Sequence, residues 1–212
     1  ATSGGATNLL KFKEPVKETY IDPYEAMMAR IDRKEQGKSD FLVKLRVEAS
    51  PNVIAFVEID KASGNVLSGQ GNGLIELEAG DDIFSINGDY TLTGGKYNFS
   101  ALGLVNRVFD IQDGSSINFS GDIMQSTLDI DAVYKTKASL SSLLSDESSV
   151  ANRRNVECGI RITDKLSNPR LEFFIDVPDL NPMIKSRVES ALSTEDKIQK
   201  QFLSLIVSNN FL

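Results

Sequence analysis

The chain has 212 residues, of which 41% are hydrophobic and 25% are charged, a balance typical of a protein with a sizeable core. Its 30 acidic and 23 basic residues give a net charge of −7, which argues against a nucleic acid as the partner. The sequence holds no histidine and one cysteine, Cys158, which excludes an internal disulfide, a cysteine-rich zinc site and most common catalytic arrangements. We therefore expect no enzymatic activity, no cofactor and no metal.

Residues 1–40 form a Gly-rich and then strongly charged lead-in. Tyr24, Met27, Met28 and Ile31 recur at helical spacing, which predicts a short amphipathic helix over 23–37. Such a helix either covers a sheet edge or docks on a partner. The apolar stretches of the chain are far shorter than the roughly 20 residues that a membrane-spanning helix needs. The polar start and the apolar end of the sequence suggest a piece excised from a longer protein.

Residues 41–135 read as a succession of strands with turn signals between them. The segment 41–47 alternates Phe41, Val43, Leu45 and Val47 with charged residues, and similar alternation recurs over 53–59, 83–92 and 127–134. Between the strands, segments such as 69–73 (GQGNG) and 93–95 (TGG) are interpreted as turns. Period-two alternation predicts an antiparallel or solenoid-like sheet with one apolar face.

The remainder of the chain changes character twice. Residues 136–155 are Ser-rich and polar and are interpreted as a long loop, after which strands resume over 156–162 and 171–177. Residues 180–212 are predicted to be helical, with Asn181 capping one helix and Ser193 capping the next. The sequence is thus mostly β. Its one-faced sheet must close into a barrel, pack against a second sheet, or curve around a groove, and the pattern does not separate these.

Few residues suggest chemistry. Asp129 and Asp131 form a D-x-D pair, a pattern that elsewhere holds a divalent metal, but on an alternating strand they are interpreted as part of a solvated face. Cys158 alternates with Val156 and Ile160 and is interpreted as a core residue.

Residues 40–212 hold several ordered motifs that match one known family. The matching motif residues are Gly88, Tyr90, Gly95, Tyr97, Phe99, Phe109, Gly114, Ile117, Phe119, Gly121, Asp122, Ala132, Tyr134, Leu140 to Leu144, Leu166, Asn168, Pro169, Leu171, Phe173, Gln201, Phe202, Ser204 and Leu205. Through these residues the segment resembles the C-terminal conserved domain of the TamB family, the translocation and assembly module, a group of AsmA-like envelope proteins. The many Asn and Lys residues look closer to versions from Bacteroides-like bacteria. Two departures are that Ile123 stands where the family has proline, and that the helix predicted over 23–37 has no counterpart.

The resemblance implies a periplasmic segment of a protein anchored in the inner membrane of a Gram-negative envelope. It further implies a long curled sheet with an apolar interior, a β-taco, and an Omp85-type outer-membrane barrel (TamA-like) as the partner. The implied functions are assembly and secretion of outer-membrane β-barrels and autotransporters, and phospholipid transport between the membranes. The alternatives from the pattern alone are a small-ligand-binding barrel or sandwich and a pure protein-docking module.

The site predicted from these patterns has two parts. The apolar strand residues are expected to line a groove for phospholipid acyl chains or nascent β-barrel strands: Phe84, Ile86, Tyr90, Leu92, Tyr97, Phe99, Phe109, Ile117, Phe119, Leu128, Ile130, Leu171, Phe173 and Ile175. A stripe on the last helix is expected either to dock on the partner or to cover the open end of the sheet: Ile198, Phe202, Leu205 and Ile206.

Overall fold

The computed structural model describes Tyr24 and residues 42–52, 54–60, 63–80, 82–101, 105–145 and 152–212. The chain divides into two compact units, Ala1–Phe41 and Leu42–Leu212, and every described strand belongs to the second unit. The helix predicted over 23–37 lies outside the described residues, apart from Tyr24.

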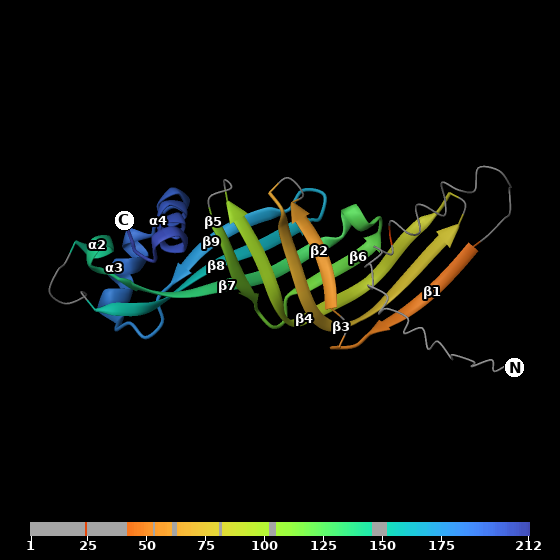
Figure 1. The fold of residues 1–212 in the computed structure, drawn as a ribbon, viewed down its shortest axis with the longest axis horizontal. Helices are drawn as coiled ribbons and strands as arrows, with labels where there is room; N and C mark the ends of the chain where they lie inside the picture. The colour runs from red at the N-terminus through yellow and green to blue at the C-terminus, as the bar shows by residue number, and fades with distance from the viewer. Residues whose placement is uncertain are drawn as a thin grey trace, which may run out of the picture. The chain divides into compact units, whose positions relative to one another are not determined.

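One antiparallel sheet dominates the second unit and confirms the mostly β, curved, one-faced architecture (Figure 1). Its path runs β1-β3-β4-β5-β7-β8-β9, and β2 and β6 lie beside it, so the described strands do not close into a barrel. The strands are β1 (Leu42–Ala49), β2 (Ile54–Asp60), β3 (Asn65–Gly80), β4 (Phe84–Ala101), β5 (Val105–Ile111), β6 (Ser116–Gly121), β7 (Thr127–Ser139), β8 (Arg153–Lys165) and β9 (Arg170–Asp176). The helices are η1 (Ile123–Gln125), α2 (Ser141–Leu144), α3 (Pro182–Ala191) and α4 (Glu195–Ser208).

The sheet bends along a line that crosses β3 and β4, and we call this bend the crease. It divides the sheet into two lobes. β3 pairs with β2 over 65–70 and with β1 over 73–80, so β1 and β2 follow each other along one side of β3. In the same way β4 pairs with β6 over 86–91 and with β5 over 96–101. We call β1, β6 and the paired parts of β3 and β4 beside them the open lobe. The closed lobe consists of β2, β5, β9 and the other halves of β3 and β4, and β7 and β8 pass through both.

Glycines allow the long strands to cross the crease. A Cβ atom at Gly71 would collide with the carbonyl oxygen of Thr91, and one at Gly95 would collide with that of Ser68. Gly95 also has a φ of 153°, which L side chains rarely adopt. The predicted turns at 69–73 and 93–95 are therefore wrong: both segments lie inside β3 and β4, where the absence of a side chain permits a bend and a close approach.

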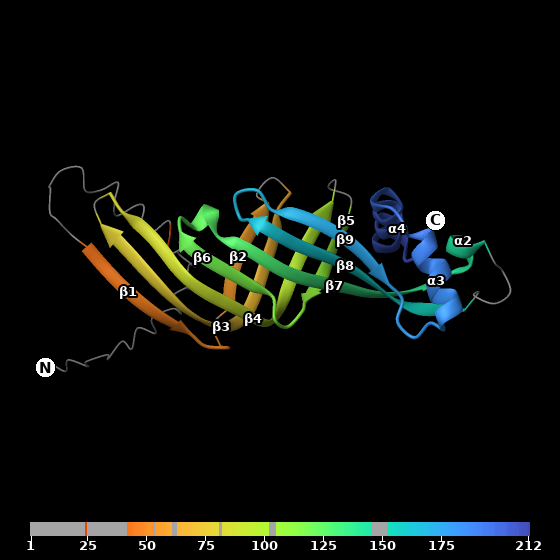
Figure 2. The same ribbon diagram turned by 180° about the vertical axis from the view of Figure 1, so that it is seen from behind.

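The closed lobe is strongly curled. Phe99 on β4 and Phe173 on β9 have ring centroids 6.1 Å apart, although four strand spacings separate them along the sheet. In a flat sheet that separation would be about 19 Å. The sheet therefore bends until β4 and β9 face each other, and Figures 1 and 2 show β4 and β5 on one side and β7 to β9 on the other.

The inner face of this curl holds the core, and ion pairs line the outer face. Fully buried inner residues include Tyr97, Phe109, Ile130 and Ile160. On the outer face Lys135 pairs with Glu157 at 3.0 Å and Lys96 pairs with Asp110. Exposed pairs of this kind contribute little stability each, so burial of the inner face stabilises the fold.

The loop predicted over 136–155 is shorter than expected. β7 continues to Ser139, and Ala138 and Leu140 are fully buried, because the period-two alternation persists through this Ser-rich segment. α2 follows directly, and β8 begins at Arg153.

The C-terminal helices form where they were predicted, with one change of cap. Asn181 accepts a hydrogen bond from the Ile184 amide at the start of α3, as the sequence predicts. α4 is capped by Thr194 instead of Ser193, because the Thr194 hydroxyl accepts from the Lys197 amide. Within the described part of the chain, no helix is both long and apolar enough to cross a membrane.

Candidate functional site

The residues predicted to line a groove do share the inner face of the sheet, but most of them are packed against their own chain. Those that are buried are Ile86, Tyr90, Leu92, Tyr97, Phe99, Phe109, Ile117, Leu128 and Ile130, and those that are half-buried are Phe84, Phe119, Leu171, Phe173 and Ile175. The prediction of one continuous open groove is therefore corrected: in the closed lobe the side chains of facing strands meet and fill the interior.

The open lobe keeps part of the same face accessible. In register, Leu45 on β1 lies beside Leu77 on β3, which lies beside Ile86 on β4. Leu45 is 53% exposed and Val47 is 44% exposed, whereas Ile86 is buried. Exposure thus increases toward β1, the edge of this lobe. We call the residues Val43, Leu45, Val47, Ile75, Leu77, Phe84 and Phe119 the open apolar face.

Charged residues occupy the opposite side of the same strands. Lys44 pairs with Glu78 at 3.2 Å, and Arg46 pairs with Glu76 at 3.0 Å. These residues alternate with the apolar ones along β1 and β3. Leu42 and Leu74 are exposed on this charged side, but they are single apolar residues among charged ones. The other face is apolar at successive positions, so the open apolar face has the character of core without a covering layer in the described residues.

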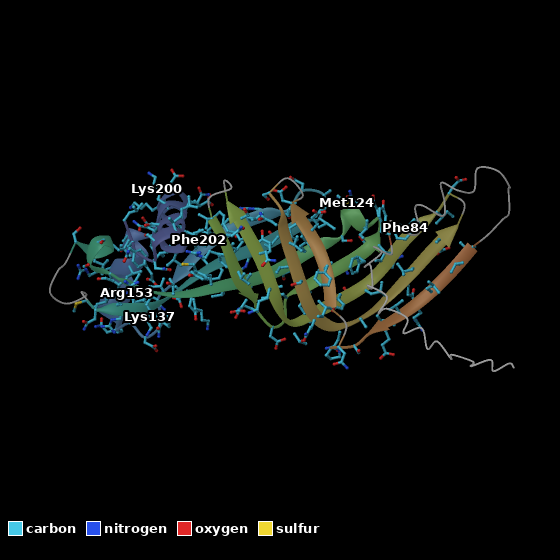
Figure 3. All side chains as sticks on the ribbon, viewed as in Figure 1. Phe84, Met124, Lys137, Arg153, Lys200 and Phe202 are labelled. Atoms are coloured by element: carbon cyan, nitrogen blue, oxygen red, sulfur yellow. The ribbon has the colours of Figure 1, made fainter. Side chains whose placement is uncertain are left out.

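Helix α4 covers the end of the closed lobe. Phe202 is fully buried, and its ring lies 4.5 Å from that of Phe173, 6.0 Å from that of Phe109 and 6.2 Å from that of Phe99, centroid to centroid. Leu205 and Ile206 are also fully buried. In Figure 3, Phe202 lies on the strand side of α4 and Lys200 on its outer side. The apolar stripe of α4 therefore completes the core of the closed lobe.

Polar contacts hold the C-terminal end of α4. The Oδ1 atom of Asn209, the C-cap residue, accepts from the Thr136 hydroxyl at 2.8 Å and from the Tyr134 hydroxyl at 3.3 Å. An Arg153 Nη donates to the Asn209 carbonyl at 3.1 Å, and an Arg107 Nη donates to the Val207 carbonyl at 3.5 Å. We call these contacts the Asn209 clamp.

The predicted partner-docking stripe is thus corrected. Phe202, Leu205 and Ile206 are turned inward onto the sheet and are not available to a partner in this structure. In the structure the stripe instead covers the end of the sheet, which was the other alternative. Ile198 is half-buried and lines a small pocket between β9, α3 and α4, together with Val177, Val188 and Leu192.

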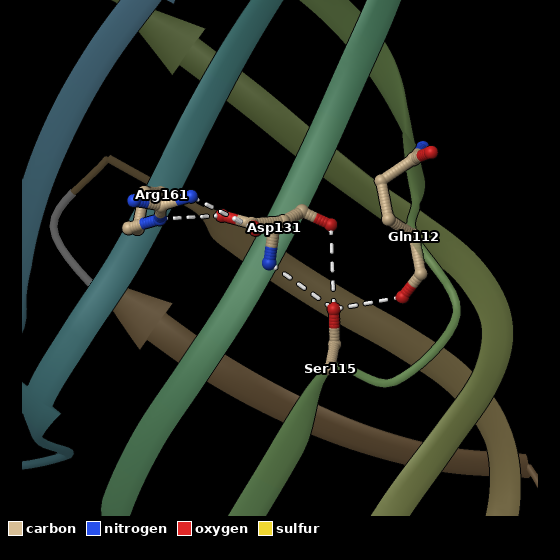
Figure 4. A network of polar contacts seen from close by, with 4 residues as sticks. All are labelled: Gln112, Ser115, Asp131 and Arg161. Carbon is tan, nitrogen blue, oxygen red and sulfur yellow. Dashed lines mark hydrogen bonds and ion pairs between the residues drawn. The ribbon is translucent and has the colours of Figure 1, made fainter.

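Asp131 of the D-x-D pair takes part in a network of polar contacts at the crease (Figure 4). The Asp131 carboxylate accepts two hydrogen bonds from the Arg161 guanidinium, at 2.8 and 3.2 Å, and these raise the pKa of Arg161. The Asp131 amide donates to the buried Ser115 hydroxyl, which donates to the Gln112 carbonyl. These contacts join β7 to the segment between β5 and β6. Within the described ranges, no three His, Cys, Asp or Glu residues gather as metal ligands would.

Two buried groups titrate abnormally in the closed lobe. Burial raises the pKa of the Cys158 thiol to about 12, and burial together with the charge of Asp60 raises the pKa of Tyr97 above its ordinary value. Tyr97 Oη has no hydrogen-bond partner among the described residues. Both groups are therefore neutral at physiological pH, in keeping with an apolar interior.

Sequence reasoning left Val43, Leu45, Val47, Ile75 and Leu77 out of the predicted groove. The alternation of segment 41–47 had already placed three of them on an apolar face. The sequence pattern does not show that these side chains are exposed. Their exposure depends on how far the sheet curls, which a local pattern does not determine.

The family model of the TamB C-terminal domain matches residues 13–212, nearly the whole chain. No curated protein matches the chain.

Proposed function

Because the chain belongs to the TamB family, we propose that its open apolar face holds phospholipid acyl chains during transport between the two membranes. Proteins of this family act in the cell envelope and in outer-membrane protein assembly, together with an outer-membrane partner. The proposal includes an Omp85-type, TamA-like outer-membrane barrel as the partner. The domain lies in the periplasm, in a protein anchored in the inner membrane, and it acts without catalysis.

The observation that supports this proposal is the exposure of Leu45 and Val47 on the face that elsewhere forms the core. Shielding an acyl chain from water gains about 0.8 kcal/mol for each CH₂ group. An apolar face binds acyl chains without directional hydrogen bonds. A bound acyl chain can therefore slide along the face at little cost in free energy.

The test compares phospholipid capture by the wild-type chain with capture by Leu45→Glu. Each purified protein is incubated with phosphatidylglycerol vesicles, separated from them, and examined by native mass spectrometry for bound lipid. Because Leu45 is half exposed, the charge leaves the fold intact and reduces capture several-fold. Leu42→Glu is the matched control, because it makes the same change at a residue of the same strand that is equally exposed, at 53%, on the opposite face. Equal capture by wild type and Leu45→Glu contradicts the proposal.

Phe99 is unsuitable for this test. The sequence analysis places Phe99 among the residues that line the groove. In the structure it is 6% exposed and contacts the rings of Tyr97, Phe109, Phe173 and Phe202. A carboxylate there unfolds the closed lobe, so a loss of lipid would report unfolding instead of a lost binding surface.

A second candidate function is supported by the edge of the open lobe. β1 pairs with β3, and among the described residues no strand pairs with its other edge. A nascent outer-membrane strand, which alternates apolar and polar residues, could add to that edge and continue the open apolar face. Hydrogen exchange separates the two: an added strand peptide protects β1 amides from exchange, whereas acyl chains leave backbone exchange at this edge unchanged.

A further inference from the structure

We propose that the inner surface beneath α4 is a second amphiphile site, and that α4 occupies it as an internal substitute for a phospholipid. The inference rests on the proposed function, since it assumes that the inner face of this sheet accepts acyl chains. It adds that the closed lobe becomes accessible when α4 leaves, and that two arginines then hold the phosphate.

The apolar half of this site is the surface that receives Phe202. The rings of Phe99, Phe109 and Phe173 surround it, and they belong to three different strands. Leu205 and Ile206 extend the contact along α4. A helix that presents a row of fully buried apolar side chains to a curled sheet fills the space that one or two acyl chains would fill.

The polar half lies at the C-terminal end of α4. The carbonyl groups at the end of a helix carry a partial negative charge, and here Arg107 and Arg153 donate to the carbonyls of Val207 and Asn209. Guanidinium groups match the geometry of a phosphate, which offers several acceptor oxygens. The helix end therefore occupies the place that an anionic head group would take above the acyl chains.

Arg107 is poorly satisfied by this substitute. It lies in register with the buried Phe99, so its side chain starts from the inner face of β5. Its Nε atom is buried and has no hydrogen-bond partner among the described residues, and its contact with the Val207 carbonyl is long, at 3.5 Å. Its guanidinium carbon lies 5.8 Å from the Tyr134 ring. It also donates to the Asn106 carbonyl, at 3.3 Å, so two long contacts to carbonyls satisfy it in part. A cation with an unused donor on an apolar surface is better matched by a phosphate than by two such carbonyls.

The way in which α4 is attached allows it to leave as a unit. It packs on β5, β8 and β9, but it takes part in none of the described strand pairs, so its departure breaks no hydrogen bond of the sheet. Its outer side is solvated, and Leu203 and Val207 are exposed there. Outside the apolar contact, the Asn209 clamp is what retains it.

The experiment loosens the clamp and measures both opening and lipid capture on the full chain. Asn209→Gly removes the acceptor of Tyr134 and Thr136 while keeping the left-handed backbone (φ 56°) that glycine tolerates. Asn210→Gly makes the same change one residue later and is the matched control, because the Asn210 side chain donates to the Ser208 carbonyl within its own turn.

Opening is measured by the alkylation rate of the single cysteine, Cys158, with iodoacetamide. Cys158 is buried and lies in register with Tyr134 of the clamp. Loss of two hydrogen bonds predicts alkylation that is about 5- to 150-fold faster in Asn209→Gly and unchanged in Asn210→Gly. Phosphatidylglycerol captured from vesicles, counted by native mass spectrometry, should rise in parallel.

The head-group contact is tested in the loosened protein. Adding Arg107→Gln to Asn209→Gly should leave alkylation fast but reduce phosphatidylglycerol capture to the level seen with dioleoylglycerol, which has no phosphate. Equal capture with and without Arg107 contradicts the phosphate site. Faster alkylation without any gain in capture shows that α4 is only a structural cover, and overturns the proposal.

The outcomes also separate this inference from the proposed function. Capture by the wild-type chain that depends on Leu45 but does not rise in Asn209→Gly supports the open apolar face and refutes the second site. Capture that appears only in Asn209→Gly and requires Arg107 supports the second site and refutes a role for the open apolar face.

Discussion

The most direct check of the closed lobe is the substitution Phe202→Ala. Phe202 is fully buried and is the one α4 residue whose ring contacts those of Phe99, Phe109 and Phe173 among the described aromatic pairs. Replacing a buried phenylalanine by alanine typically costs about 3–5 kcal/mol. Docking of α4 through Phe202, Leu205 and Ile206 gains roughly 1.5–3 kcal/mol for each side chain, so the loss is a large part of what holds the helix.

This magnitude predicts a local effect that amide hydrogen exchange detects. A loss of about 3 kcal/mol in docking free energy raises the population with α4 detached by more than about 100-fold. Amides of α4 should exchange faster by that factor, while amides of β3 and β4 in the open lobe keep their protection. Urea unfolding measures the accompanying change in global stability.

The matched control is Leu203→Ala, one residue further along the same helix. Leu203 is 40% exposed, so its removal should cost less than about 1 kcal/mol and leave the exchange of α4 nearly unchanged. The reasoning is refuted if both substitutions alter the exchange of α4 equally, because α4 would then not be docked through Phe202.

Three further predictions concern the fold and are measured by urea unfolding. Burial raises the pKa of Cys158 from 9.0 to about 12, so the unfolded thiol ionises first. The free energy of unfolding should therefore fall as the pH rises above 9, by about 1.4 kcal/mol at pH 10, and Cys158→Ala should remove that decrease. Gly71→Ala should lower the free energy of unfolding by more than about 2 kcal/mol, because the added Cβ meets the backbone of Thr91. Gly159→Ala should lower it less, because there only the ring of Phe174 has to move. Ser115→Ala removes a buried hydroxyl that joins β7 to the crease and should cost about 1–2 kcal/mol, and no measurable loss would contradict the network of Figure 4.

The local features of the fold were predictable because they depend on neighbouring residues. Alternation over 41–47 and 127–134 correctly predicted strands with one apolar face, and Asn181 with Pro182 correctly predicted the start of α3. The mostly β class follows from the number of such segments, and the ordered motifs identified the family.

Features that depend on distant contacts were not predictable. The glycines at 69–73 and 93–95 signal equally well a turn that ends a strand and a bend inside one, and only the pairing of β3 with both β1 and β2 decides for the bend. The same ambiguity applies to the stripe of α4, since an apolar helix face has the same pattern whether it packs on its own sheet or on a partner.

The candidate site shows the same division. The sequence by itself determined that one face of the sheet is apolar, since side chains alternate along every strand. It also determined that the opposite face of the open lobe is charged. Only the tertiary structure decided which part of the apolar face is filled and which part is exposed. That outcome depends on the curl that brings Phe99 to Phe173 and on the docking of Phe202 between them, contacts between residues far apart in the chain whose geometry no local pattern contains.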